Sequence, residues 1–535
     1  MRKVLFLFLL TVFLTPAFAT AEETAYQVVP APKDVRLTGG EPFVIDSSCV
    51  IVSKDGNQQM QRNALFLQEY VGQATGLRLT VTDKAPKKVK TISLVTDPAL
   101  GEEAYRLTVD GRRRSVTIAG GSPRGVFYGV QTLRKSLNNG VLPSAVITDE
   151  PRFAYRAMHL DVCRHFFPVE QVKEYIDILA LHNMNTFHWH LTDDQGWRIE
   201  SKKFPRLHQI GSQRRHTVIG RNSGLFDDTP HGGYYTQDEL REVVRYAAER
   251  CITVIPEVEL PGHALAILAA YPELGCTGGP YEVEATWGVF DDILCAGNDK
   301  AFDLLCGVID ELVEIFPSKY INIGGDEAPK TRWAKCPNCQ QRISEQGIRP
   351  SGGLSAEAKL QGYFTNRMEQ YINTKGRSII GWDEIMEGDI SQSATVLCWR
   401  GIEHGIRAAQ AGHDVIMAPT SHCYFDYYQT NENWNKPLLI GGYVPLEKVY
   451  GYEPLPDSLD ASTRRHIIGV QANLWTEYIG WRSLLLYQML PRSAAIAEVQ
   501  WAAPEQKDYS AFLRRLSSLT ALYRQYHWPY CEVKE

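Results

Sequence analysis

The sequence predicts an α/β protein in which a (β/α)₈ TIM barrel follows a small α+β domain. Apolar strand-like runs alternate with amphipathic helical segments through roughly the last 350 residues, whereas the first 150 or so show shorter alternating runs. Polar residues also follow the end of every apolar run in the longer part. Eight such strand–helix units favour a closed barrel over an open sheet.

The chain begins with a pattern that is typical of secretory signal peptides. Arg2 and Lys3 precede an apolar run over residues 4–14, and the small-residue sequence Ala17-Phe18-Ala19 follows. We expect residues 1–19 to be a signal peptide, with cleavage after Ala21 as the alternative, and the protein to be periplasmic or secreted. No later stretch is long and apolar enough for a membrane span.

The charge of the chain disfavours nucleic acid and anionic membrane surfaces as partners. Without Arg2 and Lys3 the chain has 54 basic and 62 acidic residues, a net charge of −8. The remaining length of about 515 residues is too long for one ordinary core and predicts more than one domain.

Residues 24–150 are predicted to form the α+β domain. Short alternating runs occur at residues 106–109 and 115–118, and helical patterns at 59–75 and 125–137. After Asp149-Glu150-Pro151 the short alternating runs give way to apolar strand runs that alternate with amphipathic helices, so residues 151–535 are assigned to the barrel. Its predicted strands are residues 157–162, 186–191, 253–256, 320–324, 378–382, 395–399, 414–418 and 467–474, with helices that include 169–182, 237–250, 302–316 and 356–373.

Polar and aromatic side chains after these strands should meet at one rim. Active sites of TIM barrels lie at the carboxyl ends of the strands. In strand order, these side chains are Asp161, Arg164 and His165; His190, Asp193 and Asp194; Glu257, Glu259 and His263; Asp326 and Glu327; Trp382, Asp383 and Glu384; Trp399 and Arg400; Tyr424 and Asp426; Trp475 and Glu477.

The most informative stretch is Tyr-Ile-Asn-Ile-Gly-Gly-Asp-Glu at residues 320–327. Successive side chains of a strand point to opposite faces, so Asp326 and Glu327 can share a pocket only if the chain bends at Gly324-Gly325. Two adjacent acids in different protonation states suit the cleavage of a glycosidic bond. The alternative is a strand end followed by an aspartate that caps a helix.

These motifs resemble glycoside hydrolase family 20, the exo-acting β-N-acetylhexosaminidases, over nearly the whole mature chain. The family commonly has histidine at the position of Asn322. The motifs that carry the resemblance are Gly324-Gly-Asp-Glu327, Asp161-x-x-Arg164-His165, the run from His188 to Arg198, Glu257-x-Glu-x-Pro-Gly-His263, Gly381-Trp-Asp-Glu384 and Leu474-Trp-x-Glu477.

The resemblance implies a retaining hydrolysis of terminal non-reducing β-linked GlcNAc or GalNAc. Glu327 would be the general acid and then the base, with a raised pKa. Asp326 would be ionised and would hold the N–H of the substrate's 2-acetamido group, whose oxygen attacks C1 to form an oxazolinium ion. Tyr424 would donate a hydrogen bond to that oxygen.

The resemblance also implies residues that bind the sugar. Trp382, Trp399 and Trp475 would enclose the acetamido methyl group and the ring face. Further polar residues would be Arg164 with Glu477 at O3 and O4, Asp426 at O4 and O6, and Asp193 with His263 behind Glu327. Their alternatives are a salt bridge at the rim for Arg164 and ordinary loop packing for Asp193 and His263.

Two rival functions remain open at this point. His188 and His190, followed by Asp193 and Asp194, could form the divalent metal site of a barrel hydrolase. The family resemblance implies no metal and no other cofactor. The second rival is a catalytically silent carbohydrate-binding protein with the same fold.

Eleven cysteines in an exported chain permit disulfides, and the odd number leaves at least one unpaired. Cys276 and Cys295 bracket a loop and are predicted to form a disulfide. Cys336-Pro-Asn-Cys339 is a lone CxxC motif, for which a loop disulfide or two free thiols are favoured over a zinc ribbon.

Overall fold

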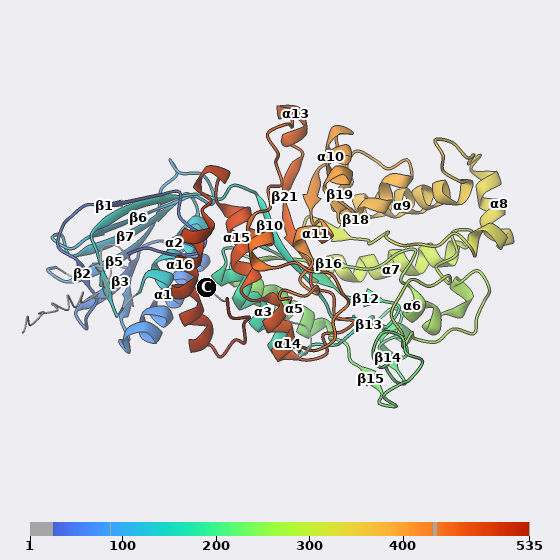
Figure 1. The fold of residues 1–535 in the computed structure, drawn as a ribbon, viewed down its shortest axis with the longest axis horizontal. Coiled ribbons are helices and arrows are strands. Elements are labelled where there is room, and N and C mark those ends of the chain that lie inside the picture. The colour runs from blue at the N-terminus through green and yellow to red at the C-terminus, as the bar shows by residue number, and fades with distance from the viewer. Residues whose placement is uncertain (1–24, 86, 138, 432–435, 534–535) are drawn as a thin grey trace, which may run out of the picture.

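The computed structural model describes residues 25–85, 87–137, 139–431 and 436–533, which form two domains side by side (Figure 1). The predicted signal peptide, residues 1–19, lies outside the described residues. A mixed sheet with two helices precedes a closed eight-stranded barrel, so the predicted fold class is confirmed. Within the described ranges, no helix combines the length and the apolar character needed to cross a bilayer.

The N-terminal domain is a seven-stranded sheet with helices α1 and α2 packed against it. Buried and partly exposed residues alternate along β6 and β7, as expected for strands with one face on a core. In sheet order, the strands are β1 (Asp34–Leu37), β9 (Ala145–Asp149), β6 (Tyr105–Asp110), β7 (Ser115–Gly120), β5 (Lys90–Thr96), β3 (Cys49–Ser53) and β4 (Thr80–Thr82), and the helices are α1 (Gln58–Thr75) and α2 (Pro123–Ser136). A small ladder pairs β2 (Phe43–Val44) with β8 (Val141–Leu142).

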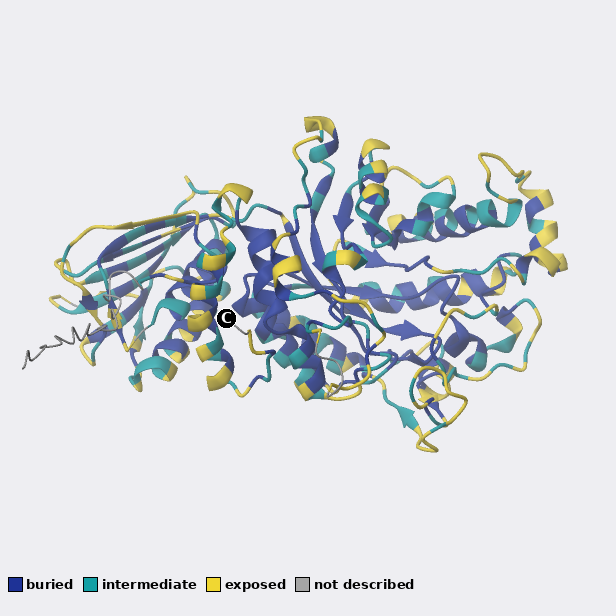
Figure 2. Cartoon of the chain, in the orientation of Figure 1, coloured by how far each residue is buried: buried dark blue, intermediate teal, exposed yellow. Residues whose placement is uncertain are grey.

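The barrel consists of eight parallel strands in sequence order, and each overlaps a predicted strand. Figure 2 shows these strands as buried along most of their length. They read as continuous apolar runs because the helices outside and the side chains inside cover both faces. The strands are β10 (Tyr155–Asp161), β11 (Thr186–His190), β16 (Thr253–Glu257), β17 (Tyr320–Asn322), β18 (Ser378–Trp382), β19 (Thr395–Cys398), β20 (Val415–Met417) and β21 (Ile467–Ala472).

The outer helices depart from eight regular units at two places. Between β20 and β21 the described residues form only helices of four or five residues. Between β18 and β19 the described chain has only a 3₁₀ turn, η3 (Asp383–Glu387), so the fifth unit has no α-helix. The main outer helices are α3 (Val169–Leu181), α5 (Gln237–Glu249), α7 (Asp299–Ile315), α9 (Ala356–Thr374), α10 (Ile402–Gln410), α14 (Arg482–Met489) and α15 (Arg492–Trp501). Shorter helices in the connections are α4 (Arg206–Gln209), α6 (Leu265–Ala270), α8 (Pro337–Glu345), α11 (Thr420–Cys423), α12 (Leu446–Tyr450) and α13 (Ala461–Arg464).

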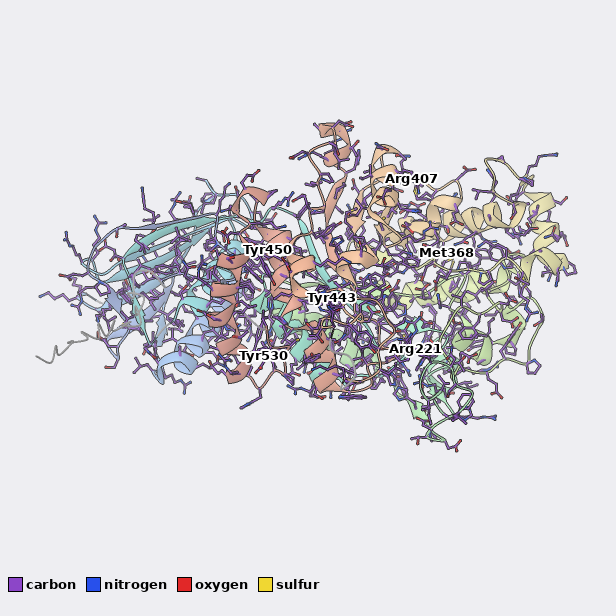
Figure 3. All side chains as sticks on the ribbon, in the orientation of Figure 1. Arg221, Met368, Arg407, Tyr443, Tyr450 and Tyr530 are labelled. Atoms are coloured by element: carbon purple, nitrogen blue, oxygen red, sulfur yellow. The ribbon has the colours of Figure 1, made fainter. Side chains whose placement is uncertain are left out.

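The two domains are joined by buried polar contacts near the start of β10. The buried Arg156 guanidinium lies 2.7 Å from the carboxylate of Glu103 in the N-terminal domain. The C-terminal helix α16 (Tyr509–Gln525) lies between the domains in Figure 1. Tyr450, labelled in Figure 3, packs against Phe512 of that helix, with 4.6 Å between ring centroids. Because Arg156 lies near the amino end of β10, this joint is remote from the rim that follows the strands.

The predicted disulfide between Cys276 and Cys295 is wrong. All eleven cysteines belong to the described residues, and each is free. The thiols of Cys276 and Cys295 lie in one cluster with those of Cys336 and Cys339. Loop spacing suggested a pair, but the fold brings two further thiols from a loop more than 40 residues away.

Candidate active site

The rim of the barrel holds a pocket of about 160 Å³. Ten of the eleven predicted site residues line it, and Asp193 lies behind its wall. Thr420, Tyr427 and Ile440 also line the pocket. Sequence reasoning missed these three, because they lie in the long connection after β20 and carry no motif. The ten predicted lining residues are Arg164, His263, Asp326, Glu327, Trp382, Trp399, Tyr424, Asp426, Trp475 and Glu477.

The chain leaves β17 at the predicted glycines. Gly324 and Gly325 have φ angles of 63° and 97°, and Glu327 itself has a φ of 45°. A Cβ atom at Gly324 would lie 1.8 Å from Oε2 of Glu259, so a side chain here would force the Glu259 carboxyl group to move and would also be strained by the positive φ. The turn therefore delivers Asp326 and Glu327 to the same pocket.

Two side-chain amides hold this turn. The Oδ1 atom of Asn322 accepts a hydrogen bond from the Gly324 amide at 3.0 Å, and its Nδ2 atom lies 3.0 Å from Nε2 of His188. Gln361 of α9 donates to the carbonyl of Gly325 at 2.6 Å. Asn322 thus links the second strand of the barrel to the turn, at the position where the resemblance expected histidine.

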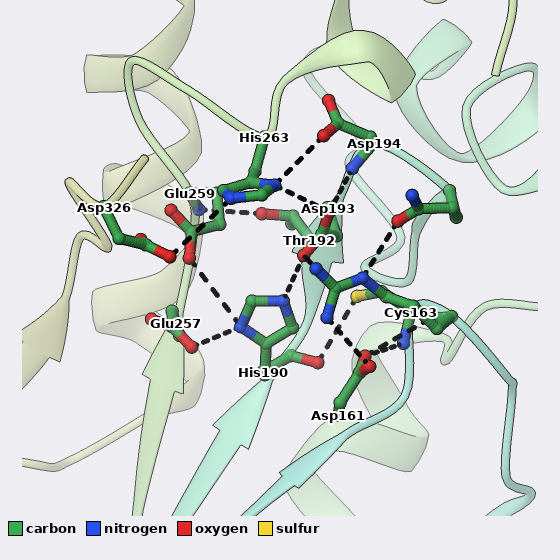
Figure 4. A network of polar contacts seen from close by, with 12 residues as sticks. Asp161, Cys163, His190, Thr192, Asp193, Asp194, Glu257, Glu259, His263 and Asp326 are labelled. Atoms are coloured by element: carbon green, nitrogen blue, oxygen red, sulfur yellow. Dashed lines mark hydrogen bonds and ion pairs between the residues drawn. The ribbon is translucent and has the colours of Figure 1, made fainter. Parts of the chain in front are cut away.

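His263 connects the acid pair to two carboxylates behind it, and Figure 4 shows its contacts with Asp326, Asp193 and Asp194. Its Nδ1 atom lies 3.0 Å from Asp194 and 3.2 Å from Asp193. Its Nε2 atom lies 3.5 Å from Oε2 of Glu327 and 3.7 Å from Oδ2 of Asp326. These carboxylates outweigh the effect of burial and raise the His263 pKa well above its usual value, so His263 carries a positive charge. The sequence placed Asp194 at the rim and in the alternative metal site but gave it no role in hydrolysis.

The pKa values of the acid pair run opposite to the expectation. The hydrogen bond from His263 lowers the pKa of Glu327 below its ordinary value. Burial raises the pKa of Asp326 to about 6. The pair therefore holds its first proton on Asp326 in the site without substrate, because Asp326 is buried whereas Glu327 is partly exposed beside a cation.

Two further acids lie near Asp326; the sequence placed them at the rim but gave them no role in the reaction. Both oxygens of Glu259 are buried without a hydrogen-bond partner among the described residues, and burial raises its pKa well above the usual range. Burial followed by the charge of Asp326 raises the pKa of Glu384 to about 9. Both acids are thus neutral near pH 7, which limits the negative charge around the pair.

Arg164 joins three carboxylates at the rim. Its guanidinium lies 2.9 Å from Asp193, 3.2 Å from Asp161 and 3.8 Å from Glu477. Arg164 and Glu477 also face the pocket. The two predicted roles of Arg164, a rim salt bridge and a sugar contact, are therefore compatible in one position.

The three predicted tryptophans form walls of the pocket. The indole of Trp382 donates to Glu257 at 2.9 Å, and the indole of Trp399 donates to Glu384 at 2.9 Å. Trp475 lies 5.7 Å from Trp382 between ring centroids, and Trp399 stacks on Tyr424 at 6.3 Å. The carboxyl groups of Glu257 and Glu384 thereby fix the planes of two indoles.

Asp426 presents unpaired oxygens to the pocket. Both are buried and have no hydrogen-bond partner among the described residues. Burial, and then the charge of Glu477, raises the Asp426 pKa well above its ordinary range. An unpaired buried carboxyl is costly, so a ligand that offers hydroxyl groups here would be bound favourably.

The histidines of the alternative metal site are engaged in hydrogen bonds. His190 lies 2.8 Å from Asp193 through Nε2 and contacts Glu257 through Nδ1. Gln471 lies 3.0 Å from Nδ1 of His188, and Glu257 lies 3.0 Å from its Nε2. This arrangement favours a supporting network, with Glu257 as a central acceptor, over a set of free metal ligands.

Comparison with known proteins gives matches over both domains. Residues 153–504 match the model for the glycosyl hydrolase family 20 catalytic domain, and residues 25–150 match the model for domain 2 of that family. A Porphyromonas gingivalis β-hexosaminidase is 42% identical over 92% of this chain and 62% of its own length. A Cellulomonas fimi β-N-acetylhexosaminidase is 31% identical over 92% of each chain.

A solved structure shows the same architecture. The family 20 exo β-N-acetylglucosaminidase from Vibrio harveyi, in complex with N-acetylglucosamine, superposes with a TM-score of 0.82 and 30% identity. The match covers 95% of this chain and 78% of the other. The chain spans less than two thirds of the Porphyromonas relative.

Proposed function

Because the chain belongs to glycoside hydrolase family 20, we propose that it is an exo-acting β-N-acetylhexosaminidase. Its substrates would be oligosaccharides or glycoconjugates with a terminal non-reducing β-linked GlcNAc or GalNAc. One observation carries the proposal: the turn after β17 brings Asp326 and Glu327 into a pocket walled by three tryptophans and Tyr424. The names of the relatives and the N-acetylglucosamine in the Vibrio complex support it.

The proposed reaction retains configuration and uses the substrate's own acetamido group. Asp326 accepts a hydrogen bond from the acetamido N–H, and Tyr424 donates to the acetamido oxygen as that oxygen attacks C1. Glu327 gives its proton to the leaving oxygen and later takes one from the water that opens the oxazolinium ion. No protein atom forms a bond to the sugar.

Substrate binding supplies the proton arrangement that this reaction needs. The acetamido N–H stabilises an ionised Asp326, which lowers its pKa, while the sugar covers Glu327 and raises its pKa. One proton thereby moves from Asp326 to Glu327 without a change in the total charge of the pair. The reversed order of pKa values in the free site is consistent with this mechanism.

The size and lining of the pocket support recognition of the terminal sugar at the non-reducing end of a glycan. The pocket has a volume of only about 160 Å³, which is consistent with a site for one terminal sugar and not with a long groove. Arg164 and Glu477 would bind O3 and O4, and Asp426 would bind O4 and O6 with its unpaired oxygens.

We also propose that the protein is exported and is periplasmic or secreted. The support is the basic, apolar and small-residue pattern of residues 1–19. Sequencing of the amino terminus of the mature protein tests this, and an intact Arg2-Lys3 segment on the protein in the cytoplasm would contradict it.

Aryl glycosides that differ only at C2 test the proposed activity. We expect the 2-acetamido β-glucoside to be cleaved at least about 10³-fold faster than the 2-hydroxy β-glucoside, because only the former carries the nucleophile. Equal rates would refute acetamido participation. The C4 epimer of the acetamido substrate then measures the preference between GlcNAc and GalNAc, and thiazoline analogues of the intermediate should inhibit tightly.

A further inference from the structure

Four cysteine thiols meet outside the proposed active site. Cys276 and Cys295 belong to the connection between α6 and α7, and Cys336 and Cys339 lie at the start of α8. These segments follow β16 and β17, at the end of the molecule remote from the N-terminal domain (Figure 1). The cluster therefore joins two successive loops of the barrel rim.

The sulfur atoms have the spacing of a tetrahedral metal site. The distances are 3.6 Å between Cys295 and Cys339, 3.7 Å between Cys295 and Cys336, and 3.8 Å between Cys276 and Cys339. All four sulfurs lie within 4.8 Å of one another. A tetrahedron with zinc–sulfur bonds of about 2.3 Å has edges of about 3.8 Å, whereas a disulfide bond is about 2.05 Å long.

We propose that Cys276, Cys295, Cys336 and Cys339 bind one zinc ion in a closed structural site. Four thiolates in a tetrahedral arrangement suit zinc among the common metals. The site leaves no open position for a water or a substrate, so its role is to stabilise the loops and not to take part in the reaction.

The surroundings favour negatively charged sulfur. Cys336 is the N-cap of α8, whose positive dipole end faces this region. Cys295, Cys336 and Cys339 are buried and Cys276 is half-buried, which shields the thiolates from oxidants.

The site would hold together the loops that carry His263 and Glu327. The amide of Leu294 donates to the carbonyl of Pro261 at 2.9 Å, two residues before His263. The indole of Trp333, which follows Glu327 in the next loop, donates to the carbonyl of Leu294 at 2.9 Å. Zinc at the cysteine cluster would thus fix the far ends of both loops. It would thereby keep His263 and Glu327, at the near ends, in a constant position relative to each other.

Metal and thiol analysis of the mature chain, purified without reductant or chelator, tests the proposal. We expect about one zinc atom per chain by elemental analysis, and eleven reactive thiols after denaturation with a chelator. Two disulfides within the cluster would leave seven thiols, four fewer than the eleven of the chain, and would overturn the proposal. Iron in place of zinc, or less than about 0.1 zinc per chain with all thiols free, would also overturn it.

Single substitutions locate the metal. Cys295→Ser and Cys339→Ser should lose most of the zinc and lower Tm by at least about 5 °C, because the bound ion stabilises only the folded chain. Cys306→Ser is the matched control, since this half-buried cysteine of α7 lies outside the cluster. Full zinc content in either cluster variant would refute the assignment. If these variants fail to fold, removal of zinc from the wild-type chain and its restoration should lower and then restore Tm, and an unchanged Tm would refute the structural role.

Discussion

The Nε2 atom of His263 lies 3.5 Å from Oε2 of Glu327. Because His263 is charged, it favours the carboxylate form of Glu327 in the site without substrate. His263 lies at a similar distance from Asp326, yet burial dominates there and raises the pKa. His263 therefore lowers the pKa of both acids, but only at Glu327 does its effect exceed that of burial.

Glu327→Gln should remove the proton transfer and leave binding nearly intact. We expect kcat to fall about 10²- to 10⁴-fold, or roughly 3–5 kcal/mol, on natural linkages. The loss should be smaller on aryl glycosides, whose leaving groups need less protonation. Glu387→Gln is the control, because Glu387 pairs with Arg400 at 2.8 Å outside the pocket and should leave kcat unchanged. Unchanged hydrolysis of natural linkages by Glu327→Gln would contradict its role.

His263→Gln should move the pH profile of kcat/KM to higher pH. The active form of the pair carries a single proton, so the wild-type rate should decline as pH rises above about 6, where Asp326 loses it. The charge of His263 lowers the pKa of both acids. Its removal should therefore shift the acidic and the basic limb of the kcat/KM profile upward by about one pH unit. His466→Gln, just before β21 at the other end of the barrel, is the control. A lower rate with unshifted limbs would indicate a purely structural role for His263.

Asp326→Asn should slow the chemical step but stabilise the fold at neutral pH. The folded-state pKa of about 6 exceeds the usual 3.8, so the ionised group costs up to about 3 kcal/mol above pH 6. This cost disappears as pH falls below 3.8, where the group is protonated in both folded and unfolded chains.

Thermal unfolding at several pH values checks this prediction for Asp326→Asn. We expect a clearly higher Tm than the wild type at pH 7.5 and a difference that becomes small near pH 4. Asp46→Asn is the control, and it should lower Tm at pH 7.5 instead of raising it, because the contact with Lys90 lowers the pKa of Asp46. An Asp326→Asn chain that is less stable than the wild type at pH 7.5 would contradict the buried-charge account.

Gly324→Ala should abolish most activity through the turn that holds the acid pair. Its Cβ atom would overlap Oε2 of Glu259, which must move and displace Asp326 and Glu327. Gly347→Ala is a matched control: Gly347 has nearly the same φ, 62° against 63°, but its Cβ would meet open space. The control should cost only about 1 kcal/mol of stability and retain kcat. Equal activity of the two variants would show that the contact with Glu259 is unimportant.

Much of this protein follows from local sequence patterns. The buried strands of the barrel were found because each is a short apolar run followed by polar residues. Ten of the eleven expected site residues line one pocket because the carboxyl ends of parallel strands share a rim. The break was readable because two adjacent glycines permit a bend, and both have positive φ in the structure.

Other features were decided only by tertiary structure. The proton order of Asp326 and Glu327 depends on burial and on the distance to His263, and neither is encoded by adjacency in the chain. The thiol cluster joins Cys276 and Cys295 to a CxxC motif in another loop, so spacing alone suggested a disulfide that does not form. Periodicity reports which face of a segment is covered, whereas pKa and metal affinity depend on the groups that other segments bring within a few ångströms.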